Sequence, residues 1–115
     1  MNPTAKTTAT PLPEVVTRFL AAANRCDAGR VAACFAPHAT VRDENRDYVG
    51  RAAIRAWVAE SCQRYRPTFT PLRSFVGPRR VGLAVAVSGQ FPGSPVTLDY
   101  DLRLQTGKIL TLTIE

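Results

Sequence analysis

The spacing of apolar side chains changes once along the chain, near Thr68, and this change restricts the possible folds. Before Thr68, apolar residues recur every three or four positions, which is the period of a helix buried on one side. After Thr68, apolar and polar residues alternate, as expected for strands that bury one face. Helices followed by a run of strands predict an α+β fold, with N-terminal helices packed on one face of a curved, mostly antiparallel sheet.

The first two helices are expected before residue 37. Pro11 and Pro13 fit only the first turn of a helix, and the apolar period after them continues to about Asn24. Asp27 is the expected N-cap of a second, shorter helix, and Pro37 is expected to stop it.

The segment between residues 39 and 66 is expected to hold a short strand and a third helix. Residues 39–43 (ATVRD) alternate as a strand does, and the polar residues 44–47 (ENRD) read as a loop. Gly50 is a turn residue ahead of the helix, in which Ile54, Trp57 and Val58 share one face.

The second half predicts an antiparallel meander. Its expected strands cover residues 69–76, 81–88, 96–105 and 109–114. Pro71 confines the first of them to a sheet edge or a bulge, because proline cannot donate a ladder hydrogen bond. Thr106 and Gly107 form the expected tight turn before the last strand.

Length and composition favour one globular domain. The chain has 115 residues, 45% of them hydrophobic, which is enough for a core at a typical domain size. No apolar run approaches the roughly 20 residues of a membrane-spanning helix, and the sequence MNPTAKTTATPLP lacks the apolar block of a signal peptide. We therefore expect a cytoplasmic protein with no membrane contact.

The net charge of +6 does not by itself indicate a nucleic-acid partner. The arginines are scattered along the sequence, and the one adjacent pair, Arg79 and Arg80, follows Gly77 and Pro78 in what reads as a solvated turn. A nucleic-acid or adaptor surface would instead require basic side chains on one face. We expect an ordinary charged exterior without nucleic-acid binding.

Cysteine and histidine usage argues against metal and nucleophile chemistry. Cys26, Cys34 and Cys62 are odd in number and form no C-x-x-C pair, so neither a zinc site nor a disulfide framework is predicted. This usage is typical of a reducing compartment. His38 is the single histidine, which leaves no catalytic triad or multi-histidine metal site.

The chain contains the motifs V-V-x-R-F, N-x-x-D, F-A-P-H-A-T-V-x-D, G-R-x-A-I-R-A-W and a terminal T-G-K-I. With the order of elements, these motifs resemble the nuclear-transport-factor-2-like superfamily, and its SnoaL-like and ketosteroid-isomerase-like branch in particular. The resemblance covers residues 12–115 and leaves residues 1–11 as a disordered tail. It implies a cystatin-like cone, in which the sheet curls around a pocket, and commonly a homodimer.

The resemblance also implies a site. In the isomerases of this superfamily a carboxylate on the first short strand shuttles a proton next to a carbonyl, and it corresponds to Asp43. Their helix tyrosine corresponds to Phe19, which has no donor, and their oxyanion acid corresponds to Tyr100. Compared with those isomerases, this chain therefore lacks the tyrosine donor on the helix, and a tyrosine hydroxyl replaces the acid as the second donor.

Strand alternation gives independent reasons to consider Asp43 and Tyr100. Asp43 shares a face with Val41, so it is either a pocket carboxylate with a raised pKa or a solvated loop carboxylate. Tyr100 is in phase with Leu98 and Leu102, so it either donates to a ligand oxygen or packs as a core tyrosine.

Further pocket candidates are mostly aromatic. Phe19 and Trp57 are expected in the core or against a ligand, and Tyr48 is expected to close the pocket mouth or to anchor its own loop. Phe91 lies in the turn-rich segment GQFPGSPV and is expected at the pocket rim. With Val41, these form the predicted ligand-binding set.

The sequence thus predicts a SnoaL-like domain that binds a small apolar or carbonyl-containing molecule. As an enzyme it would be an isomerase or a polyketide-cyclase-like enzyme, with Asp43 as acid and base, Tyr100 as donor, and neither metal nor organic cofactor. The alternative is a non-catalytic ligand-binding or protein-interaction module of the same fold.

Overall fold

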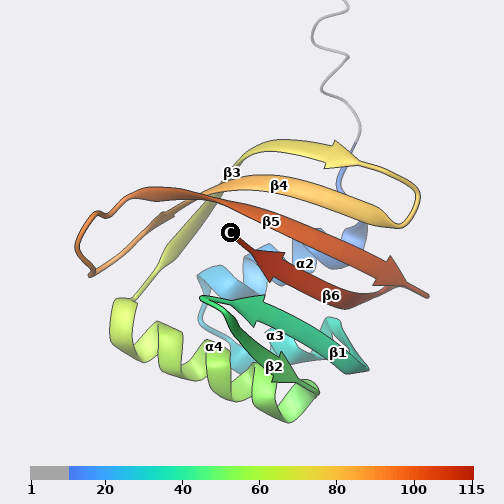
Figure 1. Ribbon diagram of the computed structural model, residues 1–115, viewed down its shortest axis with the longest axis horizontal. Helices are drawn as coiled ribbons and strands as arrows, with labels where there is room; N and C mark the ends of the chain where they lie inside the picture. Colours follow the sequence, from blue (N-terminus) through green and yellow to red (C-terminus); the bar gives the residue numbers. More distant parts are fainter. Residues whose placement is uncertain (1–10) are drawn as a thin grey trace, which may run out of the picture.

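A computed structural model describes residues 11–115 and contains three helices and six strands (Figure 1). The helices are α2 (Glu14–Asn24), α3 (Ala28–Ala33) and α4 (Arg51–Tyr65). The strands are β1 (Phe35–Asp43), β2 (Arg46–Val49), β3 (Thr68–Val76), β4 (Arg80–Ser88), β5 (Val96–Gln105) and β6 (Lys108–Ile114). The predicted tail lies outside the described residues except for Pro11.

All six strands form one sheet, in the order β2-β1-β6-β5-β4-β3. Strands β1 and β6 run parallel, and every other neighbouring pair is antiparallel. The sheet arches over α2, α3 and α4, which lie on one side of it (Figure 1). This arrangement confirms the predicted α+β class and the mostly antiparallel sheet.

The helices begin and end largely where local chemistry predicts. Helix α2 has Pro13 at its N-cap, and its apolar stripe, which includes Val16 and Phe19, is buried. The side chain of Asp27 accepts a hydrogen bond from the backbone N–H of Arg30 at 3.1 Å, which confirms its capping role for α3. None of the helices in residues 11–115 is long and apolar enough to cross a membrane.

The core lies between the helices and the inner face of the sheet. Val81, Leu83, Val85 and Val87 of β4 point into it, as their alternation predicts. Pro71 lies in the edge strand β3 beside a register shift, so the prediction of an edge or bulge position is confirmed.

Pro37 does not stop the second helix. Helix α3 ends at Ala33, and Pro37 lies inside β1, which begins at Phe35. The pairing of β1 with β6 is irregular between Phe35 and Thr40, so a residue without an N–H is tolerated there.

The predicted polar loop 44–47 is also wrong in extent. Only Glu44 and Asn45 form the turn, with φ values of 52° and 63°, while Arg46 already pairs with Asp43. Two consecutive positive φ values are the signature of a two-residue hairpin turn that matches the twist of the strands. The polar sequence therefore continues as β2.

Candidate functional site

A cavity of about 480 Å³ lies between the helices and the inner face of the sheet, within the usual range for small-molecule sites. Its wall draws on all three helices, on five strands and on the loops at one end of the sheet. The wall residues are Phe19, Leu20, Ala23, Val31, Asp43, Glu44, Trp57, Val58, Ser61, Cys62, Tyr65, Pro67, Phe69, Val87, Phe91, Pro92, Gly93, Val96, Leu98, Tyr100 and Ile114.

The strand register places the two predicted catalytic residues in one row across the sheet. Asp43 on β1 pairs with Ile114 on β6, and Ile114 pairs with Tyr100 on β5. Neighbouring strands lie about 4.8 Å apart, so the backbones of Asp43 and Tyr100 are separated by about 10 Å. The side chain of Ile114 fills the floor of the cavity between them.

Asp43 is a half-buried carboxylate without a cationic partner among the described residues. Its Oδ2 accepts a hydrogen bond from Nε1 of Trp57 at 3.2 Å. Burial raises the pKa of Asp43 above its usual value, the hydrogen bond from Trp57 lowers it, and the neighbouring Glu44 raises it again. A carboxylate in this environment is a stronger base than one in water.

Tyr100 presents a buried phenol to the same cavity. The residue is 5% exposed, and its hydroxyl makes no hydrogen bond within residues 11–115. Burial, and to a smaller extent the nearby Asp43, raises the pKa of Tyr100, so the hydroxyl stays protonated. Because a buried donor without an acceptor is costly, a ligand oxygen at this position would be bound favourably.

Most of the predicted ligand-binding residues line the cavity, but two do not. Phe19, Trp57 and Phe91 are in the wall. Val41 is fully buried in the core and does not reach the cavity, although it shares the inner face with Asp43. Tyr48 lies outside the wall. Its ring packs on the ring of Trp57, with 5.8 Å between centroids, so Tyr48 contacts a wall residue without lining the cavity itself.

The segment between β4 and β5 closes one end of the cavity, as expected for Phe91. The N–H of Gln90 donates to the carbonyl of Tyr65 at 2.7 Å, and the Phe91 and Tyr65 rings meet edge to face at 5.8 Å. A Cβ on Gly89 would lie 2.6 Å from the same Tyr65 carbonyl oxygen, so this close approach requires glycine.

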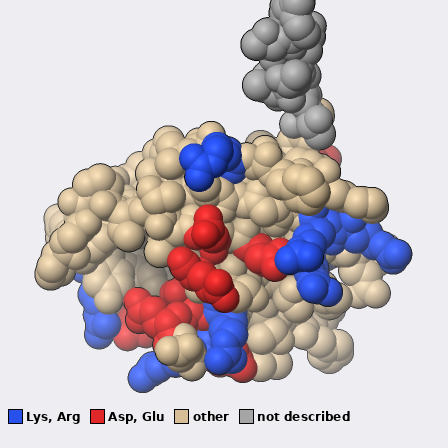
Figure 2. Space-filling model, turned by 45° about the horizontal axis from the view of Figure 1, so that its top comes forward, with Lys and Arg blue, Asp and Glu red and all other residues tan. Residues whose placement is uncertain are grey.

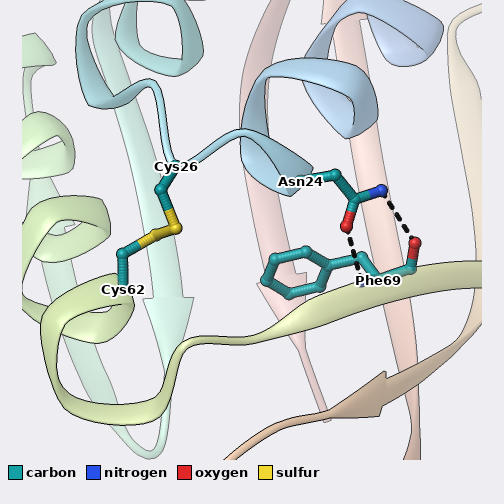
Figure 3. The surroundings of a disulfide bond; sticks show 4 residues. All are labelled: Asn24, Cys26, Cys62 and Phe69. Carbon is teal, nitrogen blue, oxygen red and sulfur yellow. Dashed lines mark hydrogen bonds between the residues drawn. A yellow bond between two sulfur atoms is a disulfide. The ribbon is translucent and has the colours of Figure 1, made fainter.

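The C-terminal end of α2 is tied to two other elements beside the cavity (Figure 3). The Asn24 side chain donates to the carbonyl of Phe69 at 2.9 Å and accepts from its N–H at 2.7 Å. Two residues later, Cys26 forms a disulfide with Cys62 of α4. Phe69 and Cys62 both belong to the cavity wall, so these links fix its shape.

The cysteine usage predicted no disulfide framework, but the structure contains one disulfide. Cys26 and Cys62 are 36 residues apart, and only the folded chain brings the segment after α2 next to α4. Rules based on local cysteine spacing cannot detect such a pair. Cys34 is free and buried, as its apolar surroundings predict.

Several wall residues were not anticipated, including Glu44, Tyr65 and Ile114. A signal for Tyr65 was present, because it follows Ser61 by one helical turn on the face that carries Val58. No comparable signal marks Ile114, whose position between Asp43 and Tyr100 depends on the pairing of strands distant in sequence.

The site offers acid–base and hydrogen-bonding groups. No group of three or more metal-ligating side chains occurs in the described part of the chain. On the face shown in Figure 2, acidic side chains gather near the centre with basic ones around them, in place of one continuous basic surface. A carboxylate and a phenol on an apolar wall can move a proton and stabilise a nearby oxygen.

Comparison with solved structures supports the fold strongly. A candidate polyketide cyclase from Sinorhizobium meliloti is 35% identical, with a TM-score of 0.87 over 90% of this chain and 95% of that one. A protein with a ketosteroid-isomerase-like fold from Catenulispora acidiphila, in complex with trimethylamine, is 20% identical, with a TM-score of 0.81 over 91% and 86% of the two chains. A cystatin-fold protein from Novosphingobium aromaticivorans is 13% identical, with a TM-score of 0.76 over 89% and 95%.

No curated protein is significantly similar in sequence. The family of SnoaL-like domains, in contrast, matches residues 16–110, which is most of the described chain. The cystatin-like and ketosteroid-isomerase-like neighbours agree with this match. The chain belongs to the SnoaL-like domain family.

Proposed function

We propose that the protein is a cofactor-independent isomerase or cyclase that moves a proton next to a carbonyl group of a small apolar molecule. Asp43 removes a proton from the carbon beside the carbonyl, and the Tyr100 hydroxyl donates a hydrogen bond to the oxygen, which gains negative charge. In an isomerisation Asp43 returns the proton to another carbon. In a cyclisation the new carbanion attacks a second carbonyl, and the proton goes to the resulting alkoxide.

The observation that carries this proposal is the row formed by Asp43, Ile114 and Tyr100. The base and the donor face one cavity, and a mostly apolar floor about 10 Å long separates their backbones. The buried Tyr100 hydroxyl lacks an acceptor within residues 11–115, and Asp43 lacks a cation there that would hold its pKa low. The Tyr100 hydroxyl can therefore donate a hydrogen bond to a ligand, and the Asp43 carboxylate can accept a proton from one.

The comparisons agree with this reaction class. The Sinorhizobium structure, which covers nearly the whole of both chains, is described as a candidate polyketide cyclase. Cyclisation of a polyketide requires carbon acidity next to a carbonyl, which is the chemistry that the pair of Asp43 and Tyr100 offers.

Hydrogen–deuterium exchange of a simple ketone tests the proton transfer without the natural substrate. We expect the protein to accelerate deuterium incorporation next to the carbonyl of beta-tetralone in D2O, followed by NMR. Asp43→Asn should abolish the acceleration, and Tyr100→Phe should reduce it by roughly 100-fold, as for the loss of an oxyanion donor.

Asp47→Asn is the matched control, because Asp47 is in the same hairpin but forms a surface ion pair with Arg42 at 2.9 Å. It should exchange at the wild-type rate. Undiminished exchange by Asp43→Asn would disprove the catalytic role of Asp43.

A non-catalytic ligand-binding domain is the second candidate. It is favoured by Phe19, which lines the cavity at the position where the resembling isomerases carry a tyrosine donor. Saturable binding of beta-tetralone by the wild-type protein, with no exchange above the rate in buffer, would assign this role.

A further inference from the structure

The charge of the cavity wall is opposite to that of the molecule. The protein carries 15 Lys and Arg side chains and a net charge of +6. Within residues 11–115 none of the wall residues is Lys, Arg or His, and the wall contains two carboxylates, Asp43 and Glu44. The basic side chains are thus kept out of the cavity that Asp43 faces.

Neither carboxylate has a cation beside it in the wall. The side-chain donor to Asp43 is the neutral Nε1 of Trp57, and its nearest charged neighbour is Glu44. At the rim, Arg64 lies over the ring of Tyr65, 5.7 Å from its centroid, and its guanidinium is 3.9 Å from Glu60. The charge of Glu44 attracts this guanidinium too, but more weakly than Tyr65 and Glu60 do. The half-buried charge of Asp43 and the exposed charge of Glu44 at the mouth repel a third negative charge and attract a cation, and at Asp43 this effect is stronger than in water.

Aromatic side chains make up much of the rest of the wall. Six of its residues are aromatic: Phe19, Trp57, Tyr65, Phe69, Phe91 and Tyr100. The faces of aromatic rings carry partial negative charge and attract ammonium groups. The buried Tyr100 hydroxyl, which has no partner within residues 11–115, gives the same cavity a fixed position for a ligand oxygen.

We infer that the pocket selects its ligands by charge, preferring apolar carbonyl compounds that carry a protonated amine, accepting their neutral analogues and rejecting carboxylates and phosphates. The carbonyl oxygen lies at Tyr100, and the amine lies toward Glu44 at the mouth. This inference rests on the proposed function, because it requires the cavity to be a small-molecule site.

Three probes of nearly equal size separate the effect of charge from that of shape: para-acetylbenzylamine, para-acetylbenzyl alcohol and para-acetylbenzoate. Isothermal titration calorimetry at neutral pH and low salt should give the amine about tenfold tighter binding than the alcohol, and the benzoate at least tenfold weaker binding. Glu44→Gln should reduce the preference for the amine by about threefold and leave the binding of the alcohol unchanged.

Glu14→Gln is the control, since it removes the same charge from an exposed position at the start of α2 outside the wall. Its amine preference should equal that of the wild type. Benzoate binding as tight as alcohol binding, or an unchanged preference in Glu44→Gln, would overturn the selection by charge. Failure of all three probes to bind the wild type would overturn the small-molecule site on which the inference rests.

Discussion

The hydrogen bond between Trp57 and Asp43 is the interaction at residue scale that most affects the proposed chemistry. Burial raises the pKa of Asp43, while the indole N–H stabilises the charged form and lowers it. A general base must be ionised, so the reaction rate should rise with pH through a pKa above the usual range of a carboxyl group. Trp57 sets how far above that range the pKa lies.

Trp57→Phe should therefore move the pH profile of ketone exchange to higher pH. The substitution keeps an aromatic ring and removes the donor, so the ionised form of Asp43 loses stabilisation and its pKa rises further. The exchange rate measured as a function of pH gives the midpoint.

Tyr48→Phe is the control, because Tyr48 packs on Trp57 without contacting Asp43 through a hydrogen bond. Its midpoint should match that of the wild type. A midpoint in Trp57→Phe that is unchanged or lower would show that the indole does not tune Asp43.

At the scale of residues, the sequence predicted which face of the sheet the site side chains lie on but not their hydrogen-bond partners. Alternation along β1 and β5 was sufficient to place Asp43 and Tyr100 on the inner face. The bond from Trp57 to Asp43 joins a helix to a strand, and its formation depends on how α4 crosses the sheet. No local pattern encodes that crossing, so Trp57 could be predicted as a core or pocket residue but not as the hydrogen-bond donor to Asp43.

At the scale of elements, the disulfide between Cys26 and Cys62 joins α4 to the segment that follows α2. This bond does not fit the predicted cytoplasmic location, because thiols stay reduced in a reducing compartment. The bond closes a long segment of chain, and such a crosslink restricts the unfolded state strongly.

Loss of this bond should lower the free energy of unfolding by about 3–4 kcal/mol, the value expected for a crosslink that spans 36 residues. Urea denaturation of the Cys26→Ser, Cys62→Ser double variant measures the loss. Reductant should destabilise the wild type to the same extent and leave the double variant unaffected. A wild type that is insensitive to reductant would contradict a stabilising disulfide.

The boundaries of elements were predictable where one residue controls them. Asp27 caps α3, and Thr106 and Gly107 form the turn before β6, both with positive φ. The two errors, at Pro37 and at residues 44–47, occurred where pairing between strands overrides local preference. A proline or a polar run argues against a strand only until the rest of the sheet is known.

At the scale of the whole molecule, the outer face of the sheet remains partly apolar. Phe75 on β3 is 72% exposed and lies opposite Gly82, which in turn pairs with Asp101. Asp101 forms a two-pronged ion pair with Arg80, at 3.0 Å for both bonds. We propose that this face forms the homodimer interface expected from the family resemblance, with Phe75 as an apolar contact on a largely polar surface.

Light scattering at increasing protein concentration tests this interface. The wild type should reach the mass of a dimer, and Phe75→Asp should weaken the association at least tenfold, because a buried charge replaces an apolar contact. Ala59→Asp, on the exposed side of α4 across the sheet, makes the same change of charge and should still dimerise. A wild type that stays monomeric at high concentration would refute the proposal.

The architecture was predictable from residue periodicity at this scale, whereas the cavity was expected only from the family resemblance. A change of period from helical to alternating already implies helices stacked on a sheet. Whether the space between them is filled depends on how closely side chains such as Phe19 and Leu98 approach each other in three dimensions. Packing of that kind is a property of the assembled fold and not of any one segment.

The row of Asp43, Ile114 and Tyr100 holds the proposed base and the proposed donor at a fixed separation. Its length is two strand spacings, which are set by backbone hydrogen bonds and not by the side chains that line the cavity. Substitutions in the helices or in the loop that carries Phe91 would reshape the space above the row and change which molecules enter it. The interval between proton acceptor and hydrogen-bond donor would stay the same, so new ligands could be admitted without rebuilding the chemistry.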